Sequence, residues 1–87
     1  MILIGDIGNT DTKICVINNK HEIIKRIIIP TNRVNNSILS NKLNFYIKRK
    51  NLIRKSLFCS VVPNKFVTVK KFVKKNLKIK CVELKQL

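Results

Sequence analysis

The chain has 87 residues, of which 45% are hydrophobic and 26% charged, and its formal net charge is +15. This length allows one small domain, which buries only about 60–65% of the surface that its unfolded form exposes. The composition is that of an ordinary folded domain and argues against disorder. No apolar run reaches the roughly 20 residues that a membrane span requires, and the N-terminus lacks a secretory pattern, so we expect a cytoplasmic protein without a membrane segment.

The high positive charge raises the hypothesis of nucleic-acid binding, because a basic domain attracts phosphate backbones. Codon composition offers a simpler source, since Ile, Asn and Lys, which A/T-rich codons favour, supply nearly half of the chain. Aromatic residues are few and Lys outnumbers Arg, whereas base stacking and bidentate phosphate contacts favour aromatic residues and Arg. A small basic binding module for nucleic acid or an acidic protein, using the lysines of residues 64–78, is therefore the alternative and not the first hypothesis.

The cysteines and the single histidine do not form the pattern of a metal site or a disulfide framework. Cys15, Cys59 and Cys81 are far apart, odd in number and without a Cys-x-x-Cys pair, so we expect reduced thiols in the core. His21 follows an Asn-Asn-Lys segment whose turn chemistry predicts a solvated residue.

Hydrophobic patterns predict three strands in the first third of the chain. We expect them at residues 2–6, 12–18 and 22–29, and their short connections make them an antiparallel meander. In the second strand, Lys13, Cys15 and Ile17 should share one face. The third strand should stop at Pro30, which has no N–H group to donate to a neighbouring strand.

A polar loop at residues 30–36 leads into a predicted helix. Asn35, Asn36 or Ser37 can cap this helix by accepting a hydrogen bond from its free N–H groups. Apolar residues then recur at helical spacing, and they are Leu39, Leu43, Tyr46 and Ile47. The basic residues expected on the solvated side are Lys42, Lys48, Arg49 and Lys50.

The last third of the chain predicts strand, helix and strand. Apolar residues on both faces of residues 57–62 indicate a central strand covered by helices. The following helix, at 64–78, should expose its lysines, and its apolar residues are Phe66, Val69, Val73 and Leu77. With a fifth strand at 79–84, the order is β-β-β-α-β-α-β, an α/β fold with helices packed on a mixed sheet.

The stretch Asp-Ile-Gly-Asn-Thr at residues 6–10 has the composition of a phosphate-binding loop. Asp6 can hold a hydrated Mg²⁺ ion, and Gly8 lets a bulky anion approach the backbone. Backbone N–H groups and hydroxyls of Asn9, Thr10 and Thr12 can donate to phosphate oxygens, and Lys13 adds positive charge. A plain hairpin turn is the simpler interpretation. The free-energy cost of burying Asp6 after four apolar residues favours a functional role.

Two motifs resemble those of a known family. The opening MILIGDIGNTDTK resembles the first phosphate motif of the actin-like, ribonuclease-H-fold ATPases, and its Asp-Ile-Gly-Asn-Thr form resembles that of type III pantothenate kinases. The Ser-Val-Val-Pro at residues 60–63 is similar to the sequence that these kinases carry at the corresponding place. On the residues alone, Ser60 need only satisfy a local hydrogen bond, and Pro63 suits the start of a helix.

The resemblance covers essentially the whole chain and implies that residues 1–87 are the N-terminal lobe of an actin-like ATPase. It implies ATP-dependent phosphorylation of pantothenate, the first step of coenzyme A synthesis, with Mg²⁺ and a monovalent cation, K⁺ or NH₄⁺. Asp6 would hold the metal. The residues that would bind the ATP phosphates are Asp6, Ile7, Gly8, Asn9, Thr10, Asp11, Thr12 and Lys13. Full-length members of the family imply a homodimer.

Two further motifs of the family do not occur in these residues. One is a Gly-Ala-Asp-Arg segment that supplies the base and contacts pantothenate, and the other is a second phosphate loop, Asp-x-Gly-Thr-Ala. We therefore expect the second lobe to be absent, this chain to contain no catalytic residue, and the lobe to be inactive alone. Pantothenate would bind only if the second lobe were supplied. Whether the chain by itself is an enzyme stays open.

Overall fold

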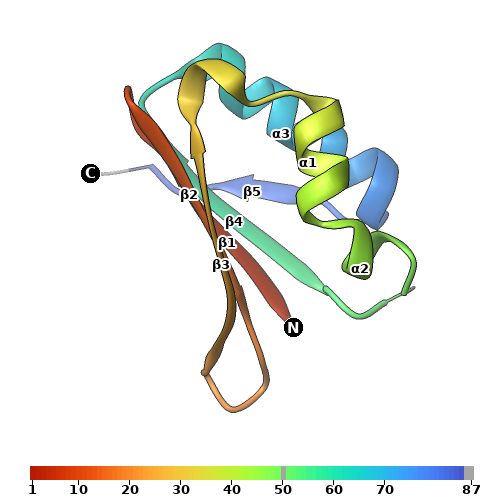
Figure 1. The fold of residues 1–87 in the computed structure, drawn as a ribbon. Coiled ribbons are helices and arrows are strands. Elements are labelled where there is room, and N and C mark those ends of the chain that lie inside the picture. The colour runs from red at the N-terminus through yellow and green to blue at the C-terminus, as the bar shows by residue number, and fades with distance from the viewer. Residues whose placement is uncertain (50, 86–87) are drawn as a thin grey trace.

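The computed structural model describes residues 1–49 and 51–85, which form a two-layer α/β fold (Figure 1). Within these residues, five strands make one mixed sheet in the order β3-β2-β1-β4-β5. The strands are β1 (Ile2–Ile7), β2 (Asp11–Ile17), β3 (Ile23–Pro30), β4 (Lys55–Ser60) and β5 (Cys81–Glu83). The helices are η1 (Thr31–Arg33), α1 (Asn36–Lys42), α2 (Asn44–Ile47) and α3 (Pro63–Leu77). The predicted fold class is confirmed.

The sheet is built around β1, which pairs antiparallel with β2 and parallel with β4. The chain passes from β3 to β4 through α1 and α2, and from β4 to the parallel strand β5 through α3. These α-helices lie on the same side of the sheet in Figure 1. Alternation along β1 therefore gives its residues different surroundings: Leu3, Gly5 and Ile7 are buried, whereas Ile2, Ile4 and Asp6 are partly or fully exposed.

The hydrophobic core lies between the sheet and the helix layer. Its fully buried side chains include Leu3, Ile7, Ile14 and Phe58 from the strands and Leu39, Val69, Phe72 and Val73 from the helices. The four apolar residues predicted to form the buried stripe of α3 are all buried, and Phe72 joins them. No helix in the described part of the chain is both long and apolar enough to cross a bilayer.

The opposite face of the sheet has no helix over it among the described residues, so the prediction that helices cover both faces of β4 is wrong. Ser56 and Phe58 are buried under the helices, whereas Leu57 and Cys59 on the other face are partly exposed. Both helical connections lie on one side of the sheet, which leaves this second face uncovered. We call it the open face. Ile28 of β3 and Val82 of β5, also on this face, are 58% and 41% exposed.

The open face also corrects the expectation that all the thiols lie in the core. Cys15 and Cys59 are free and partly exposed on it, and only Cys81 is buried. Ser56 donates a hydrogen bond from its hydroxyl to the Cys81 sulfur at 3.4 Å. Burial raises the pKa of the Cys81 thiol, against smaller lowering effects of the Ser56 hydrogen bond and of Lys70.

The single helix predicted after a cap at residues 35–37, with its apolar stripe from Leu39 to Ile47, is two short helices, α1 and α2, which meet at Leu43. The backbone of Leu43 has φ −108° and ψ 14°, outside the helical range. Its N–H donates to Leu39 at 2.9 Å, and its carbonyl accepts from Tyr46 and Ile47, so the break leaves no backbone group of Leu43 unpaired. Leu39, Leu43 and Tyr46 are still buried, as the spacing predicted.

The capping residue of α1 and the basic residues near α1 and α2 lie where the sequence predicted them. Asn35 is the residue that caps α1, and its side chain accepts a hydrogen bond from the Ile38 N–H at 2.9 Å. Lys42, Lys48 and Arg49 are exposed as predicted. Lys50, predicted with them, lies outside the described residues.

The β2–β3 turn is closed by one asparagine. The Asn18 side chain accepts hydrogen bonds from the N–H groups of Lys20 and Glu22, both at 2.9 Å. The left-handed residue of the turn is His21, with φ 64°, and not one of the asparagines. His21 is exposed, as predicted.

Gly5 should be intolerant of a side chain, because a Cβ atom there would overlap the ring of Phe58 on the neighbouring strand. We expect Gly5→Ala to lower the free energy of unfolding by about 1–3 kcal/mol through overpacking. Urea denaturation followed by circular dichroism measures this change. As a control, Phe58→Leu makes room for the methyl group, so the double variant should lose less stability than the sum of the two single variants. Strict additivity would contradict the steric explanation.

Helix α3 ends at Leu77 and is followed by its capping residue Lys78, whose φ of 60° and ψ of 32° are left-handed. We expect Lys78→Gly to raise the free energy of unfolding by about 0.5–1 kcal/mol, because glycine adopts this conformation without a Cβ clash. The matched control is Lys75→Gly in the last turn of the same helix, which should lower stability by about 1 kcal/mol. Thermal unfolding of the two variants compares them directly, and a shift of both in the same direction would refute the assignment.

Candidate nucleotide-phosphate site

Three segments meet at the edge of the sheet where β1 and β4 both end. The parallel register pairs Ile7 with Ser60, so the two strands stop side by side. The Val61 N–H donates to the Ile7 carbonyl at 3.0 Å and ties the two strand ends together. Helix α3 begins at Pro63, directly after this point, so its positively polarised N-terminus lies at the same edge. This edge therefore favours an anion.

The loop between β1 and β2, residues 8–10, is a tight turn. The Gly8 N–H donates to the Asp11 carbonyl at 3.0 Å. A Cβ atom on Gly8 would also lie 3.0 Å from that carbonyl oxygen, closer than side-chain carbons normally approach. The φ of Gly8 lies outside the left-handed region. Glycine is thus needed here for close packing inside the loop, while Asn9, Thr10 and Asp11 are exposed.

Thr31 lies under this loop and is its main contact with the rest of the fold. It is the first residue of η1, directly after β3, and only 3% of the residue is exposed. Its hydroxyl donates to the Gly8 carbonyl at 2.7 Å, and its N–H donates to the Thr10 carbonyl at 2.8 Å. Thr31 falls within the polar loop predicted at residues 30–36, and the sequence did not predict this role. The only local signal was a threonine directly after the proline that ends a strand.

Ile7 and Thr12, both expected to bind phosphate, have fully buried side chains. The Thr12 hydroxyl lies 2.9 Å from the Thr31 hydroxyl, on the helix side of the sheet. A hydrogen bond from this hydroxyl to a phosphate oxygen does not fit that geometry. Both residues support the loop from below instead, Ile7 through its backbone and Thr12 through Thr31.

Asp6 and Lys13 are paired neighbours on β1 and β2, and both are exposed on the open face. The premise that Asp6 is buried at a cost in free energy is therefore wrong, because its side chain points away from the helix layer. Two hollows, of about 370 and 330 Å³, meet at Asp6 and Cys59. The larger extends to Glu83 beside the end of β4, and the smaller extends to Lys13.

The donor set at Asp6 fits a metal ion that is held mainly by water and by phosphate. Among residues 1–49 and 51–85, no group of three or more His, Cys, Asp or Glu side chains gathers to form a metal cage. Mg²⁺ usually keeps several waters and takes one or two carboxylates together with the phosphates of its substrate. The exposed carboxylate of Asp6, beside the loop at residues 8–10, matches that mode of binding.

Ser60 has the local role that its sequence position suggested. Its hydroxyl accepts a hydrogen bond from the Val62 N–H and donates one to the Val62 carbonyl, both at 3.0 Å. These bonds shape the two-residue connection between β4 and α3. The start of α3 is thereby fixed relative to the end of β4.

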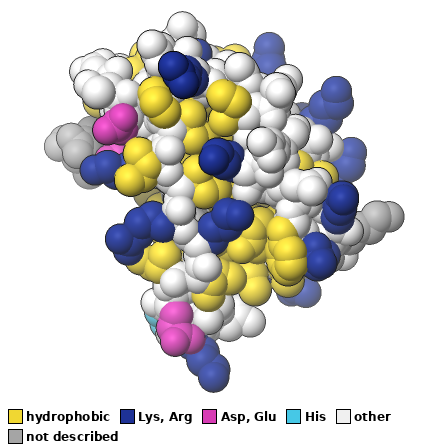
Figure 2. Space-filling model, viewed as in Figure 1, with side chains coloured by type: hydrophobic (Ala, Val, Ile, Leu, Met, Phe, Trp, Pro, Cys, Tyr) yellow, Lys and Arg dark blue, Asp and Glu magenta, His cyan; other side chains and the backbone are white. Residues whose placement is uncertain are grey.

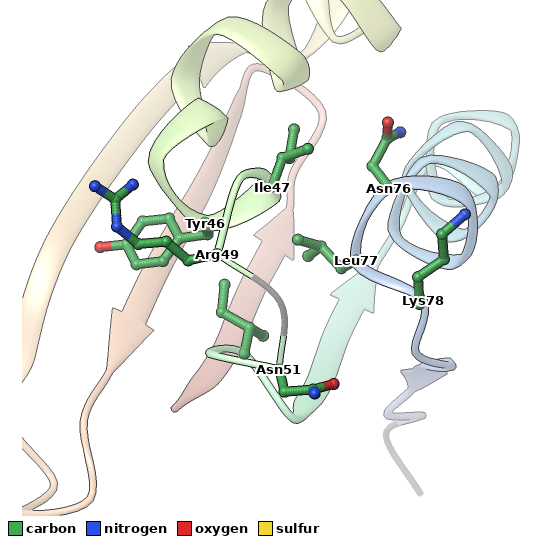
Figure 3. A pocket seen from close by; sticks show the side chains of 8 residues that line it. Tyr46, Ile47, Arg49, Asn51, Asn76, Leu77 and Lys78 are labelled. Carbon is green, nitrogen blue, oxygen red and sulfur yellow. The ribbon is translucent and has the colours of Figure 1, made fainter.

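A further hollow, of about 270 Å³, lies at the other end of the sheet, between α2, the segment before β4 and the end of α3 (Figure 3). Its inner surface includes Ile47, Ile53 and Leu77. Arg49 also borders it, but the guanidinium stacks 3.6 Å over the Phe45 ring and donates to the Phe45 carbonyl. Because the polar side chains do not converge on one point, this hollow is a weaker candidate than the edge at Asp6.

Exposed Lys and Arg residues occur in strands, in helices and in connecting segments of the described chain. Figure 2 shows Lys and Arg side chains distributed across the visible face, with apolar side chains between them. The exposed lysines of α3 are Lys70, Lys71, Lys74 and Lys75. This distribution gives no specific support to the alternative of a basic binding module.

Comparison with known proteins identifies the family of this chain. The sequence profile described as type III pantothenate kinase matches residues 2–87. A curated protein described as type III pantothenate kinase, from Pelagibacter ubique (strain HTCC1062), is 55% identical over 87 residues, which are 100% of this chain and 35% of that protein. The chain thus spans about a third of the length of this relative. It belongs to the type III pantothenate kinase family.

Proposed function

We propose that residues 1–87 form the N-terminal lobe of a type III pantothenate kinase and bind the phosphates of ATP at the loop between β1 and β2. The observation that carries this proposal is the meeting of the loop, the N-terminus of α3 and the Asp6 carboxylate at one edge of the sheet. Membership of the family, which uses ATP, supports it.

Each part of the edge has a distinct task in this proposal. The exposed loop residues Asn9 and Thr10 offer backbone N–H groups to phosphate oxygens, as nests of such donors do in other proteins. Lys13 places a positive charge on the open face beside them. Phosphoryl transfer depends chiefly on such a positioned electrostatic field, because the protein supplies little covalent chemistry.

Asp6 is the residue that would hold Mg²⁺, through water or directly, on the open face next to the loop. The ion would neutralise phosphate charge when bound. Asp6 would hold the charge of the ion in a fixed place beside the loop. Its carboxylate is itself fixed, because the next residue of β1, Ile7, is buried.

The activity of the whole protein is, on this proposal, ATP-dependent phosphorylation of pantothenate, the first step of coenzyme A synthesis, in a homodimer that also uses K⁺ or NH₄⁺. The base and the pantothenate contacts would come from the Gly-Ala-Asp-Arg segment of the family, which residues 1–87 do not contain. These residues supply one wall of the site, so we expect them to bind ATP weakly, because a phosphate exposed to water on its other side gains less from each contact.

Titration of the isotope-labelled chain with Mg-ATP, followed by NMR, tests the phosphate site. We expect the amide signals of Gly8, Asn9 and Thr10 to shift, and Asp6→Asn to weaken the affinity in the presence of Mg²⁺ by about tenfold, the effect of losing one charged contact. The control is Glu22→Gln, an exposed acidic residue on the β2–β3 turn whose contact with the Asn18 side chain a glutamine can keep.

Two results would contradict the proposal. One is the absence of any shift at millimolar Mg-ATP. The other is a set of shifts that is confined to the lysines of α3 and responds equally to Asp6→Asn and Glu22→Gln, which would indicate attraction to positive charge alone.

A further inference from the structure

We infer that Thr31 is a positioning residue that holds the loop at residues 8–10 in the shape that binds a polyphosphate. The identity of the ligand rests on the proposed function, whereas the hydrogen bonds of Thr31 do not depend on it. Thr31 contacts the loop from the buried side, through the Gly8 and Thr10 carbonyls. Its action is therefore through the loop.

The direction of the hydrogen bonds follows from counting protons. Each threonine hydroxyl has one proton, and the Thr31 hydroxyl donates its proton to the Gly8 carbonyl at 2.7 Å. The bond of 2.9 Å between the two hydroxyls must then use the proton of Thr12. The result is a directed chain from Thr12 to Thr31 to Gly8, and both hydroxyls belong to buried residues.

This chain fixes which way the loop peptides point. A trans peptide carries its C=O and the following N–H on opposite sides. Since the Gly8 carbonyl points to Thr31, the N–H of Asn9 points away from Thr31 and from the helix layer. The Thr31 N–H also binds the Thr10 carbonyl, so Thr31 holds both ends of the loop. A donor aimed outward before the ligand arrives needs no reorganisation when an anion binds.

The position of Thr31 is itself fixed by α3. The Lys65 ammonium donates to the Val34 carbonyl at 3.0 Å, and the Val34 N–H donates to the Thr31 carbonyl at 3.2 Å. Among the described residues, every buried side-chain nitrogen and oxygen has a hydrogen-bond partner. Removing the Thr31 hydroxyl would thus leave the Gly8 carbonyl and the Thr12 hydroxyl without their partner, which costs more than the bond alone.

The test compares Thr31→Val, which keeps the shape and removes the hydroxyl, with Thr31→Ser, which keeps the hydroxyl. We expect Thr31→Val to weaken Mg-ATP affinity by about tenfold, the effect of roughly one buried hydrogen bond, and Thr31→Ser to restore it. Amide hydrogen exchange without ATP should be about tenfold faster at Gly8 and at residue 31 in Thr31→Val only. Thr68→Val is the control, because the Thr68 hydroxyl bonds the Asn64 carbonyl within α3.

The two readouts separate the possible failures. If the wild-type chain does not bind Mg-ATP, the proposed function is wrong, and the exchange rates still decide the role of Thr31. Unchanged exchange and affinity in a folded Thr31→Val variant would overturn the inference, and so would an equal loss in Thr68→Val. If Thr31→Val does not fold, Thr12→Val replaces it. That variant removes the first donor of the chain and should weaken binding about threefold, and wild-type affinity would overturn the inference.

Discussion

The parallel pairing of β1 with β4 is the constraint on which the rest of the structure depends. Gly5 permits it, because the ring of Phe58 occupies the space where any other residue would place its Cβ atom. The register that follows brings Ile7 and Ser60 to the same edge. The loop after β1 and the beginning of α3 therefore lie beside each other. One glycine in the central strand thus allows the pairing that brings the loop and the N-terminus of α3 to the same edge.

Along β1 and β2, side chains that pack in the core alternate with side chains that face outward. The residues that face the helices, such as Leu3 and Ile14, make the core, and the residues between them, including Asp6 and Lys13, face outward. A register slip of one residue in either strand would exchange its two sets and turn its charged side chain, Asp6 or Lys13, toward the core. The stability of the core and the exposure of the charged pair are therefore consequences of the same pairing.

Much of the fold was predictable from the sequence, because strand alternation and turn residues are local signals. They gave the order of elements, the antiparallel meander and the buried stripe of α3. The uncovered face was not predictable, since apolar residues such as Leu57 and Val82 look alike whether or not a neighbour covers them. The loop was recognisable from Asp6 and Gly8. Its support was not, because Thr31 acts on Gly8 from 23 residues away and depends on tertiary structure.

The open face has a practical consequence through its thiols. Cys59 lies directly opposite Asp6 in the register of β1 and β4, and it is free and partly exposed, while Cys81 is buried. Replacing Cys15 by serine leaves Cys59 as the accessible attachment point for a fluorophore or a spin label. Such a label would stand beside the carboxylate that we assign to the metal without displacing any residue of the loop. Cys59 thus offers a labelling position from which events at this edge of the sheet can be followed.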